Sequence, residues 1–321
     1  MRNCSFHPQV IGPTTQVKAW DYRAMKSYND YGTWIRNRFP YRVQKISIDA
    51  GFTCPNRDGS KGRGGCVFCD NNTFNPSYCN KSKTITQQLE EGKAFFARKY
   101  PDMKYLAYFQ AFSNTYAPLQ HLRKLYEEAL QVKDVVGLVI ATRPDCIDDE
   151  KLDYLQELSR RTFLIVEYGV ESCNDETLRI INRCHTFECS QEAIRKTHER
   201  GITVGAHIIL GLPGEDREEI IRQIPLVSSL EIDILKLHQM QIIKGTKLDS
   251  DFTPRPTIFS VDEYIALIAE YIRRIRKDIV MERFVSQSPK ELLVAPNWGL
   301  KNHEFTDRLD NYLKSHSPSS H

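Results

Sequence analysis

The sequence predicts an α/β fold in which parallel strands alternate with helices. Six short apolar runs rich in β-branched residues recur along the chain. They are typical of buried parallel strands, because their apolar residues are continuous and do not alternate with polar ones. A doubly wound sheet and a barrel both fit this order, and both place their chemistry at the carboxyl ends of the strands. The runs are residues 45–51, 105–110, 136–142, 163–169, 203–210 and 232–238.

Capping sequences and apolar spacing identify helices around these strands. Residues 84–87 (TITQ) form a capping box that starts the first helix, which ends before Pro101. A second helix is indicated by apolar residues at helical spacing between positions 119 and 129. Residues 260–263 (SVDE) form another capping box, and it precedes an apolar stripe that runs to position 275. We interpret that stripe as core packing.

Composition places the chain among ordinary globular proteins. It has 321 residues, of which 40% are hydrophobic and 26% are charged. Its net charge of +3 neither requires nor excludes a nucleic-acid partner. No apolar run approaches the roughly 20 residues that a membrane helix needs, and the start, MRNCSFHPQV, lacks the apolar core of a signal peptide. We therefore expect a cytoplasmic protein without membrane association.

The strand–helix pattern divides the chain into four expected segments. Residues 1–44 form an N-terminal extension rich in aromatic and basic residues, and residues 45–245 hold the repeated strands and helices. Residues 246–313 form a helical or mixed C-terminal extension. The polar tail at 314–321 is expected to be disordered.

A cysteine-rich loop, CPNRDGSKGRGGCVFC, follows the first strand directly. Its three thiols, Cys54, Cys66 and Cys69, leave a metal centre with an open position, whereas a structural zinc site needs four ligands. The loop glycines permit tight turns close to a bulky inorganic group. In a reducing compartment, clustered cysteines bind metal more often than they pair as disulfides. The alternatives are a zinc site completed by Cys79 or Cys4, and a loop without metal.

Cys66-Val-Phe-Cys69 resembles the second half of the radical S-adenosylmethionine (SAM) signature, Cys-x3-Cys-x2-Cys, with its aromatic residue before the third cysteine. The gap between Cys54 and Cys66 is longer than in the common form and resembles that of the branch containing the Elongator catalytic subunit. Within that branch, residues 51–69 resemble a bacterial family of radical SAM proteins with a Cys-x11-Cys-x2-Cys motif. The resemblance covers about residues 25 to 310.

This resemblance implies a fold and two cofactors. The fold is a partial (βα)6 TIM-type barrel over residues 45–245, with N- and C-terminal extensions. Cys54, Cys66 and Cys69 would hold three irons of a 4Fe–4S cluster, and SAM would chelate the fourth. A reductant such as flavodoxin or ferredoxin would supply the electron that cleaves SAM. The resulting 5′-deoxyadenosyl radical would take a hydrogen atom from the substrate.

The resemblance also implies residues that contact SAM, most of them directly after a strand. Residues 110–115 follow the second strand and correspond to the region that contacts the SAM amino group, although the usual Gly-Gly-Glu is absent. Residues 207–215 resemble the segment near the adenine. Glu171 stands where the related pattern often has Gln. No residue is assigned to the hydrogen transfer itself. The candidates are Phe68, Gln110, Ser113, Asn114, Thr115, Arg143, Glu171, Arg183, His207, Ile209, Gly211 and Pro213.

The Elongator-like resemblance implies tRNA as substrate, with a modified wobble uridine as the specific target. The run WIRNRFPYR at 34–42 is compatible with gripping phosphates and stacking on bases. It is equally compatible with a segment that covers the barrel edge with snorkelling arginines. Two alternatives to a tRNA-modifying enzyme stay open: a radical SAM enzyme for a small metabolite or a protein, and a non-catalytic, zinc-stabilised RNA-binding module.

Overall fold

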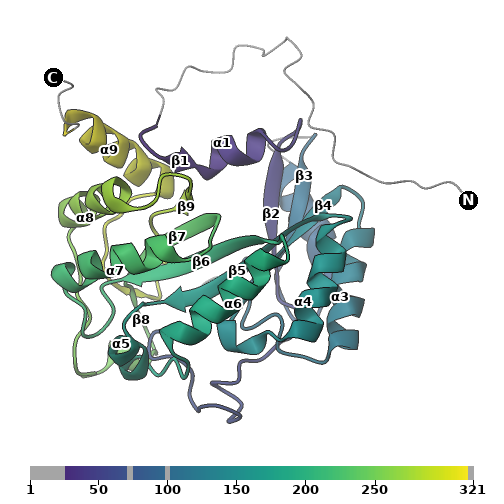
Figure 1. Cartoon of the computed structure of the whole chain (residues 1–321), viewed down its shortest axis with the longest axis horizontal. Coiled ribbons are helices and arrows are strands. Elements are labelled where there is room, and N and C mark those ends of the chain that lie inside the picture. The colour runs from purple at the N-terminus through teal and green to yellow at the C-terminus, as the bar shows by residue number, and fades with distance from the viewer. Residues whose placement is uncertain (1–25, 71–74, 98–101, 317–321) are drawn as a thin grey trace, which may run out of the picture.

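A computed structural model describes residues 26–70, 75–97 and 102–316, so that Cys4 and the expected disorder of 317–321 lie outside the described residues. Its centre is a curled eight-stranded sheet in the order β1-β9-β7-β6-β5-β4-β3-β2 (Figure 1). All neighbouring strands in this sheet are parallel. The strands are β1 (Asn29–Asp30), β2 (Val43–Ile48), β3 (Lys104–Phe109), β4 (Val135–Thr142), β5 (Phe163–Glu171), β6 (Thr203–Leu210), β7 (Ile234–Gln239) and β9 (Val280–Arg283).

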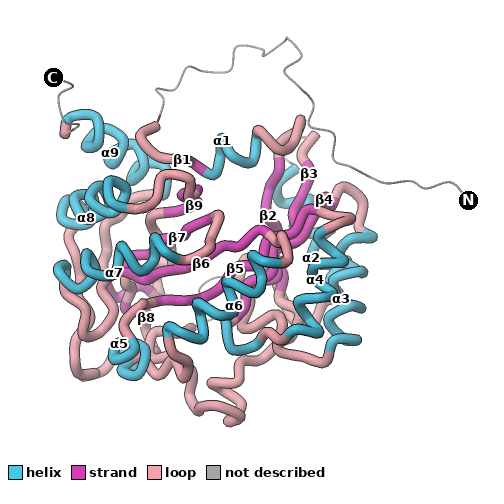
Figure 2. Tube along the Cα trace, viewed as in Figure 1, coloured by secondary structure: helices cyan, strands magenta, loops and turns pink. Residues whose placement is uncertain are grey.

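The six strands predicted from the apolar runs are β2 to β7, and the predicted α/β partial barrel is confirmed. The sheet bends into a half-barrel whose outer face is covered by helices (Figure 2). Most residues of the inner strands are buried on both faces, which explains why their sequences are continuously apolar. The carboxyl ends of β2 to β7 lie at one end of the barrel, where the loop after β2 is found.

The helices follow the strands as expected. The two predicted capping boxes form: Gln87 N donates to Thr84 Oγ1 before α2, and Ser260 caps α8 reciprocally with Glu263. No helix in the described ranges is both long and apolar enough to cross a membrane. The helices are α1 (Tyr31–Arg36), α2 (Ile85–Ala97), α3 (Leu119–Gln131), α4 (Asp149–Ser159), α5 (Asp175–Ile180), α6 (Phe187–Glu199), α7 (Arg217–Ser229), α8 (Val261–Arg274) and α9 (Asn302–Ser315), with short 3-10 turns at Pro144–Cys146 and Lys247–Asp249.

Both extensions contribute strands that the sequence patterns did not predict. β1 and β9 pair with each other and extend the sheet beyond β7, so the sheet has eight strands where the repeat predicted six. β8 (Ile242–Ile243) and β10 (Leu293–Ala295) form a separate antiparallel pair. Strands of two to four residues are too short for a periodic signal. At the carboxyl end, α9 continues to Ser315, into the segment expected to be disordered.

The aromatic and basic run at 34–42 lies at the end of the barrel opposite the cysteine loop (Figure 1). The rings of Trp34 and Phe39 pack against Phe163, the first residue of β5, and Arg38 stacks on Trp34. Ile35 joins an apolar layer inside the barrel formed by several strands. This packing supports the edge-covering interpretation of the run and argues against its use as a base-stacking surface at the mouth of the barrel.

Candidate active site

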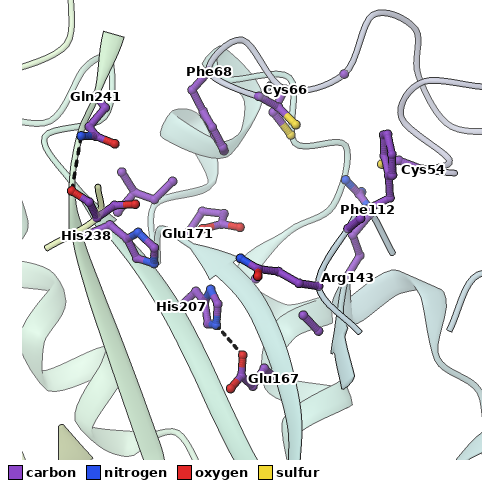
Figure 3. A pocket seen from close by; sticks show the side chains of 18 of the residues that line it. Cys54, Cys66, Phe68, Phe112, Arg143, Glu167, Glu171, His207, His238 and Gln241 are labelled. Atoms are coloured by element: carbon purple, nitrogen blue, oxygen red, sulfur yellow. Dashed lines mark hydrogen bonds and ion pairs between the residues drawn. The ribbon is translucent and has the colours of Figure 1, made fainter. Parts of the chain in front are cut away.

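A cavity of about 210 Å³ opens at the carboxyl ends of the strands, beneath the cysteine loop. Figure 3 shows Cys66 and Phe68 above it, Arg143 and Glu171 at its centre, and His207 and His238 below. The walls therefore come from the loop after β2, from the ends of β3 to β7, and from the segment that follows β9. Burial and convergent polar groups are typical of a ligand site.

The three predicted cysteines line this cavity as free thiols. Cys66 Sγ accepts hydrogen bonds from Asn56 Nδ2 and Arg183 Nη1, both at 3.6 Å. Arg57 lies beside Cys69 and donates to its carbonyl oxygen at 2.7 Å. Such cationic and amide donors stabilise thiolates and lower the electron density on sulfur. The loop thus presents three sulfurs to one space and surrounds them with positive charge.

The glycines of the loop are required by its packing. A Cβ at position 62 would overlap the side-chain oxygen of Asn56. Asn56 also donates to the carbonyl of Asn182, and this contact fixes the loop against the turn after β5. Gly65 has a positive φ of 74° and leaves space for the Arg57 side chain. The glycines therefore bring amide and guanidinium donors to the thiols.

The donor groups at this site suit a 4Fe–4S cluster with SAM. In the part of the chain that the structure describes, no three His, Cys, Asp or Glu side chains are close enough together to hold one metal ion. In a 4Fe–4S cluster each thiolate binds a different iron, so the three sulfurs need no common ion. Beside them, Arg143 Nη1 is buried and has no hydrogen-bond partner among the residues that the structure describes. A donor left unpaired in a cavity fits an anionic ligand group such as the SAM carboxylate.

Several predicted SAM-contacting residues are brought together around the cavity. Arg143 is 2% exposed, and it is held by Asp145 and by the carbonyl of Arg183. Burial opposes the charge of Arg183, but Cys66 and Glu171 outweigh it and raise its pKa. Glu171 ends β5 with a positive φ of 69° and pairs with Arg183 at 3.4 Å. The predicted SAM-contacting residues that line the cavity are Phe68, Gln110, Arg143, Glu171, Arg183, His207 and Ile209.

The other predicted residues do not line the cavity. Ser113 and Thr115 are fully buried and share hydrogen bonds with Thr142, while Asn114 Nδ2 donates to the carbonyl of Ala141. These bonds fasten the loop after β3 to β4. Gly211 and Pro213 are buried as well, and a Cβ at Gly211 would collide with the Thr257 carbonyl. For these five positions the structure supports a packing role.

A buried charge network lies on the inner wall of the barrel and joins residues that the sequence patterns did not link to one another. Glu167 Oε1 pairs with Lys45 at 2.9 Å and Glu167 Oε2 with Lys236 at 2.7 Å, and both lysines also reach Glu282. Tyr108 donates to Glu167, and His207 completes its shell (Figure 3). The sequence held a signal for this network: polar residues stand at the alternate positions 236 and 238, and Glu167 and Glu171 lie four residues apart on either side of Gly169. Alternate residues of a strand share a face, which here points into the barrel.

The network fixes the ionisation of its members. Burial opposes the charge of Glu167, but Lys236 and Lys45 outweigh it and hold its pKa well below its usual value. Burial lowers the pKa of Lys236 to about 8 despite the neighbouring carboxylates. Burial also lowers the pKa of His207. The inner wall is therefore an ionised salt-bridge cluster beside a neutral imidazole.

Glu215, after β6, is expected to make the stability of the protein pH-dependent. It is 3% exposed, accepts hydrogen bonds from Ser172 and Gln223, and has its pKa raised by burial to about 7. The folded protein keeps this proton up to about pH 7, whereas the unfolded chain releases it near the usual value of 4.5. Stability is therefore lost as pH rises through this window, by about 3 kcal/mol at most.

Urea unfolding between pH 5 and 8 checks this prediction. Glu215→Gln, which cannot ionise, should lose less stability than the wild type as pH rises. Glu176→Gln is the matched control, because Glu176 is an exposed carboxylate on α5. Equal pH slopes for Glu215→Gln and the wild type would show that Glu215 is ionised in the folded state throughout.

Comparison with known proteins gives two family matches. Residues 54–224 match the family described as the Radical SAM superfamily, and residues 232–315 match the Radical_SAM C-terminal domain. The Bacillus subtilis protein YtqA is 36% identical to this chain over 291 residues, which cover 90% of each protein. Both the cysteine loop and the segment carrying β9 thus lie within matched regions.

Two archaeal proteins are more distantly similar. The tRNA uridine(34) acetyltransferase of Methanocaldococcus jannaschii is 24% identical over 203 residues, covering 59% of this chain and 36% of that protein. The structure of Methanocaldococcus infernus Elp3 superimposes with a TM-score of 0.61 at 16% identity, covering 86% of this chain. This chain spans 63% of the Elp3 chain. At this identity the superposition shows a shared fold.

Proposed function

The chain belongs to the radical SAM superfamily, and we propose that it modifies tRNA, with a wobble uridine as the target. Membership makes it a radical SAM enzyme with SAM and a 4Fe–4S cluster as cofactors. The alternative of a non-catalytic zinc module is therefore set aside. The observation that carries the tRNA proposal is a group of exposed cations around the cysteine loop, at the mouth of the cavity.

The chain's own residues supply ligands, charge and shape for this chemistry. A reduced 4Fe–4S cluster held at this site would supply the electron for the cleavage of SAM, and SAM would supply the radical for hydrogen abstraction. We assign cluster binding to the three cysteines of the loop. Arg143 and Arg183 are positioned to bind the SAM carboxylate, since both are buried cations beside those cysteines. Phe68 and Ile209 provide apolar wall against which a ring can pack and from which water is excluded.

The cations around the mouth come from two segments. Arg57, Lys61 and Arg63 are exposed on the cysteine loop. Lys247 is exposed on the 3-10 turn after β8, and its ammonium lies close to the backbone of Gly64. Exposed lysines and arginines around a concave site are the usual means of gripping a phosphate backbone. The name of the M. jannaschii relative, which specifies tRNA uridine 34, supports the choice of RNA and of nucleotide.

The proposal also implies where the enzyme works and which reaction step it carries out. A tRNA-modifying enzyme would work in the cytoplasm, and a cytoplasmic reductant such as flavodoxin or ferredoxin would serve it. Acetyl transfer is not carried over to this chain, because the similarity covers only 36% of the archaeal acetyltransferase. The proposal is restricted to the radical step at the RNA base.

Binding of tRNA at different salt concentrations tests the proposal. We expect affinity to fall steeply with salt, and the double variant Arg63→Gln/Lys247→Gln to bind roughly tenfold more weakly with a shallower salt slope. The matched control is Arg308→Gln/Lys314→Gln on α9, which lies at the opposite end of the molecule (Figure 1). Nucleosides from hypomodified tRNA incubated with reduced holoenzyme and SAM would then be analysed by mass spectrometry. Salt-independent binding with no nucleoside of altered mass would favour a small metabolite or a protein as substrate.

A further inference from the structure

Arg283 carries a positive charge that its protein surroundings do not balance. It is the last residue of β9, lines the cavity, and lies next to Lys236 of β7 in the sheet register. Lys45 and Lys236 are matched by the carboxylates of Glu167 and Glu282. Among the described residues, no carboxylate comes within ion-pair distance of Arg283. The inner wall of the barrel therefore has one cation in excess.

The guanidinium of Arg283 is also incompletely hydrogen-bonded. Its Nη2 contacts the ring of His238, 2.8 Å from Nε2, and its Nε is buried with no partner within the described structure. Burial, together with Arg283 itself, holds the pKa of His238 well below its usual value, so the ring is neutral. His238 can accept a hydrogen bond from the guanidinium, but it cannot neutralise the charge. An acceptor that carries negative charge is missing.

Ser286 supplies a second unused donor on the same wall. It is 6% exposed, lines the cavity, and its Oγ has no partner in the part of the chain described. Its backbone is held rigidly, because Ser286 N donates to Gln239 Oε1 at 2.8 Å and Gln239 Nε2 donates to the Ser286 carbonyl at 2.9 Å. Gln241 approaches the same carbonyl (Figure 3). The hydroxyl thus belongs to a residue that lines the cavity and whose backbone is fixed.

A guanidinium without a carboxylate partner and a hydroxyl without a hydrogen bond, both judged among the described residues, are costly in one cavity wall unless a ligand satisfies them. We propose that Arg283 and Ser286 bind an anionic group of the substrate, a carboxylate or a phosphate. Either group offers the negative charge and the several acceptor oxygens that a guanidinium fork and a hydroxyl can share. The proposal rests on the proposed use of this cavity for SAM-dependent chemistry, but not on the substrate being RNA.

The anion is distinct from the SAM carboxylate. Arg143 and Arg183 lie beside the cysteine loop, and Arg143 Nη1 has no hydrogen-bond partner there within the described ranges. β9, which carries Arg283, is separated from β4, which leads into Arg143, by β7, β6 and β5 in the sheet. SAM placed at the cysteines would leave the wall at Arg283 for the molecule that receives the radical. The two arginine groups therefore divide the cavity into a cofactor end and a substrate end.

Calorimetric titration tests this proposal. The SAM-loaded holoenzyme, kept free of reductant, is titrated with inorganic phosphate and, separately, with acetate, at constant ionic strength. We expect saturable binding of one or both probes, and at least about tenfold weaker binding to Arg283→Gln. Arg283→Lys should lose less affinity than Arg283→Gln, and Ser286→Ala should weaken binding to an intermediate degree. Arg308→Gln, on exposed α9, should bind as the wild type does. Iron content and the melting temperature of each variant check that it is folded.

The outcomes distinguish a carboxylate substrate from a phosphorylated one. They also distinguish a failure of the anion-site proposal from a failure of the tRNA proposal. Tighter binding of acetate points to a carboxylate substrate, and tighter binding of phosphate points to a phosphorylated one. Equal affinity of the wild type and Arg283→Gln, or no saturation up to roughly 50 mM probe, overturns the assignment. Saturable probe binding to the SAM-free holoenzyme that is absent from the SAM-loaded holoenzyme also overturns it, because Arg283 would then serve the cofactor. None of these binding measurements requires RNA or catalytic turnover, so a failure of the tRNA proposal would not affect their results.

Discussion

Cys66→Ala is expected to abolish the iron–sulfur cluster and with it the cleavage of SAM. Cys66 is 7% exposed, and its sulfur receives hydrogen bonds from Asn56 and Arg183. Losing this thiolate should reduce 5′-deoxyadenosine formation by more than the roughly 100-fold that an altered outer-shell partner can cost. The smaller side chain should cost only about 1 kcal/mol of stability. Iron and sulfide analysis after anaerobic reconstitution, followed by chromatography of the nucleoside product, would measure both effects.

Cys173→Ala is the matched control, since Cys173 is equally buried at 7% and does not line the cavity. It should keep wild-type iron content and SAM cleavage. Cys79→Ala, analysed for iron and SAM cleavage in the same way, tests the rejected zinc interpretation. Cys79 is buried in the main core and would be a metal ligand only if the loop held zinc. If Cys66→Ala retained a full cluster, the assignment of the three loop cysteines would be wrong.

The predictable parts of this site are those whose residues lie close together in the sequence or directly follow a recognisable strand. The loop from Cys54 to Cys69 could be identified from three thiols and a phenylalanine that follow one strand. Arg143 and Glu171 could be placed because each lies at the carboxyl end of a buried strand, and the ends of parallel strands meet at one end of a barrel. Arg183 could be placed near them because it belongs to the connection that follows β5, after α5. The structure brings these residues to one cavity.

The parts that could not be predicted depend on tertiary contacts. Ser113, Asn114 and Thr115 follow β3, as a cofactor-binding segment would, but the hydroxyls of Ser113 and Thr115 and the Nδ2 of Asn114 form hydrogen bonds with β4. No sequence pattern reports which way a loop side chain turns. Arg283 was missed for a different reason: it ends a strand of four residues, which leaves no periodic signal.

The charged interior of the half-barrel links fold and function. A closed barrel fills its interior with apolar layers, and here an apolar layer occupies only the amino end of the strands, where Ile35 of α1 packs. Above it, Lys45 on β2 reaches Glu282 on β9, two strands that are not paired in the sheet. These side chains therefore connect the two sides of the open barrel and also form the inner wall of the cavity. Stability and ligand binding depend on the same residues.

Glu167→Gln is expected to lower the free energy of unfolding by about 3–5 kcal/mol at neutral pH, because it leaves Lys45 and the buried Lys236 with Glu282 as the one remaining carboxylate for two positive charges. The side chain of Glu167 is fully buried, and Lys236 is nearly so. Urea denaturation of the apoprotein would measure the loss. The double variant Glu167→Gln/Lys236→Met should recover much of it, since it removes one of the stranded charges. Glu192→Gln, which breaks an exposed pair with Arg195 on α6, should have no measurable effect.

The pH dependence of the stability difference between the wild type and Glu167→Gln identifies the cause of the destabilisation. The pKa of Glu167 is held well below 4.5 in the folded protein, so its carboxylate contributes stability above the unfolded pKa and loses it as pH falls through the folded value. The gap between the wild type and Glu167→Gln should therefore stay constant from pH 7 to about pH 5 and narrow in stronger acid. A gap that stayed constant in acid would assign the loss to altered packing and leave the buried salt bridges without a role in stability. A gap that closes in acid, together with rescue by Lys236→Met, would show that unpaired buried charge causes the destabilisation.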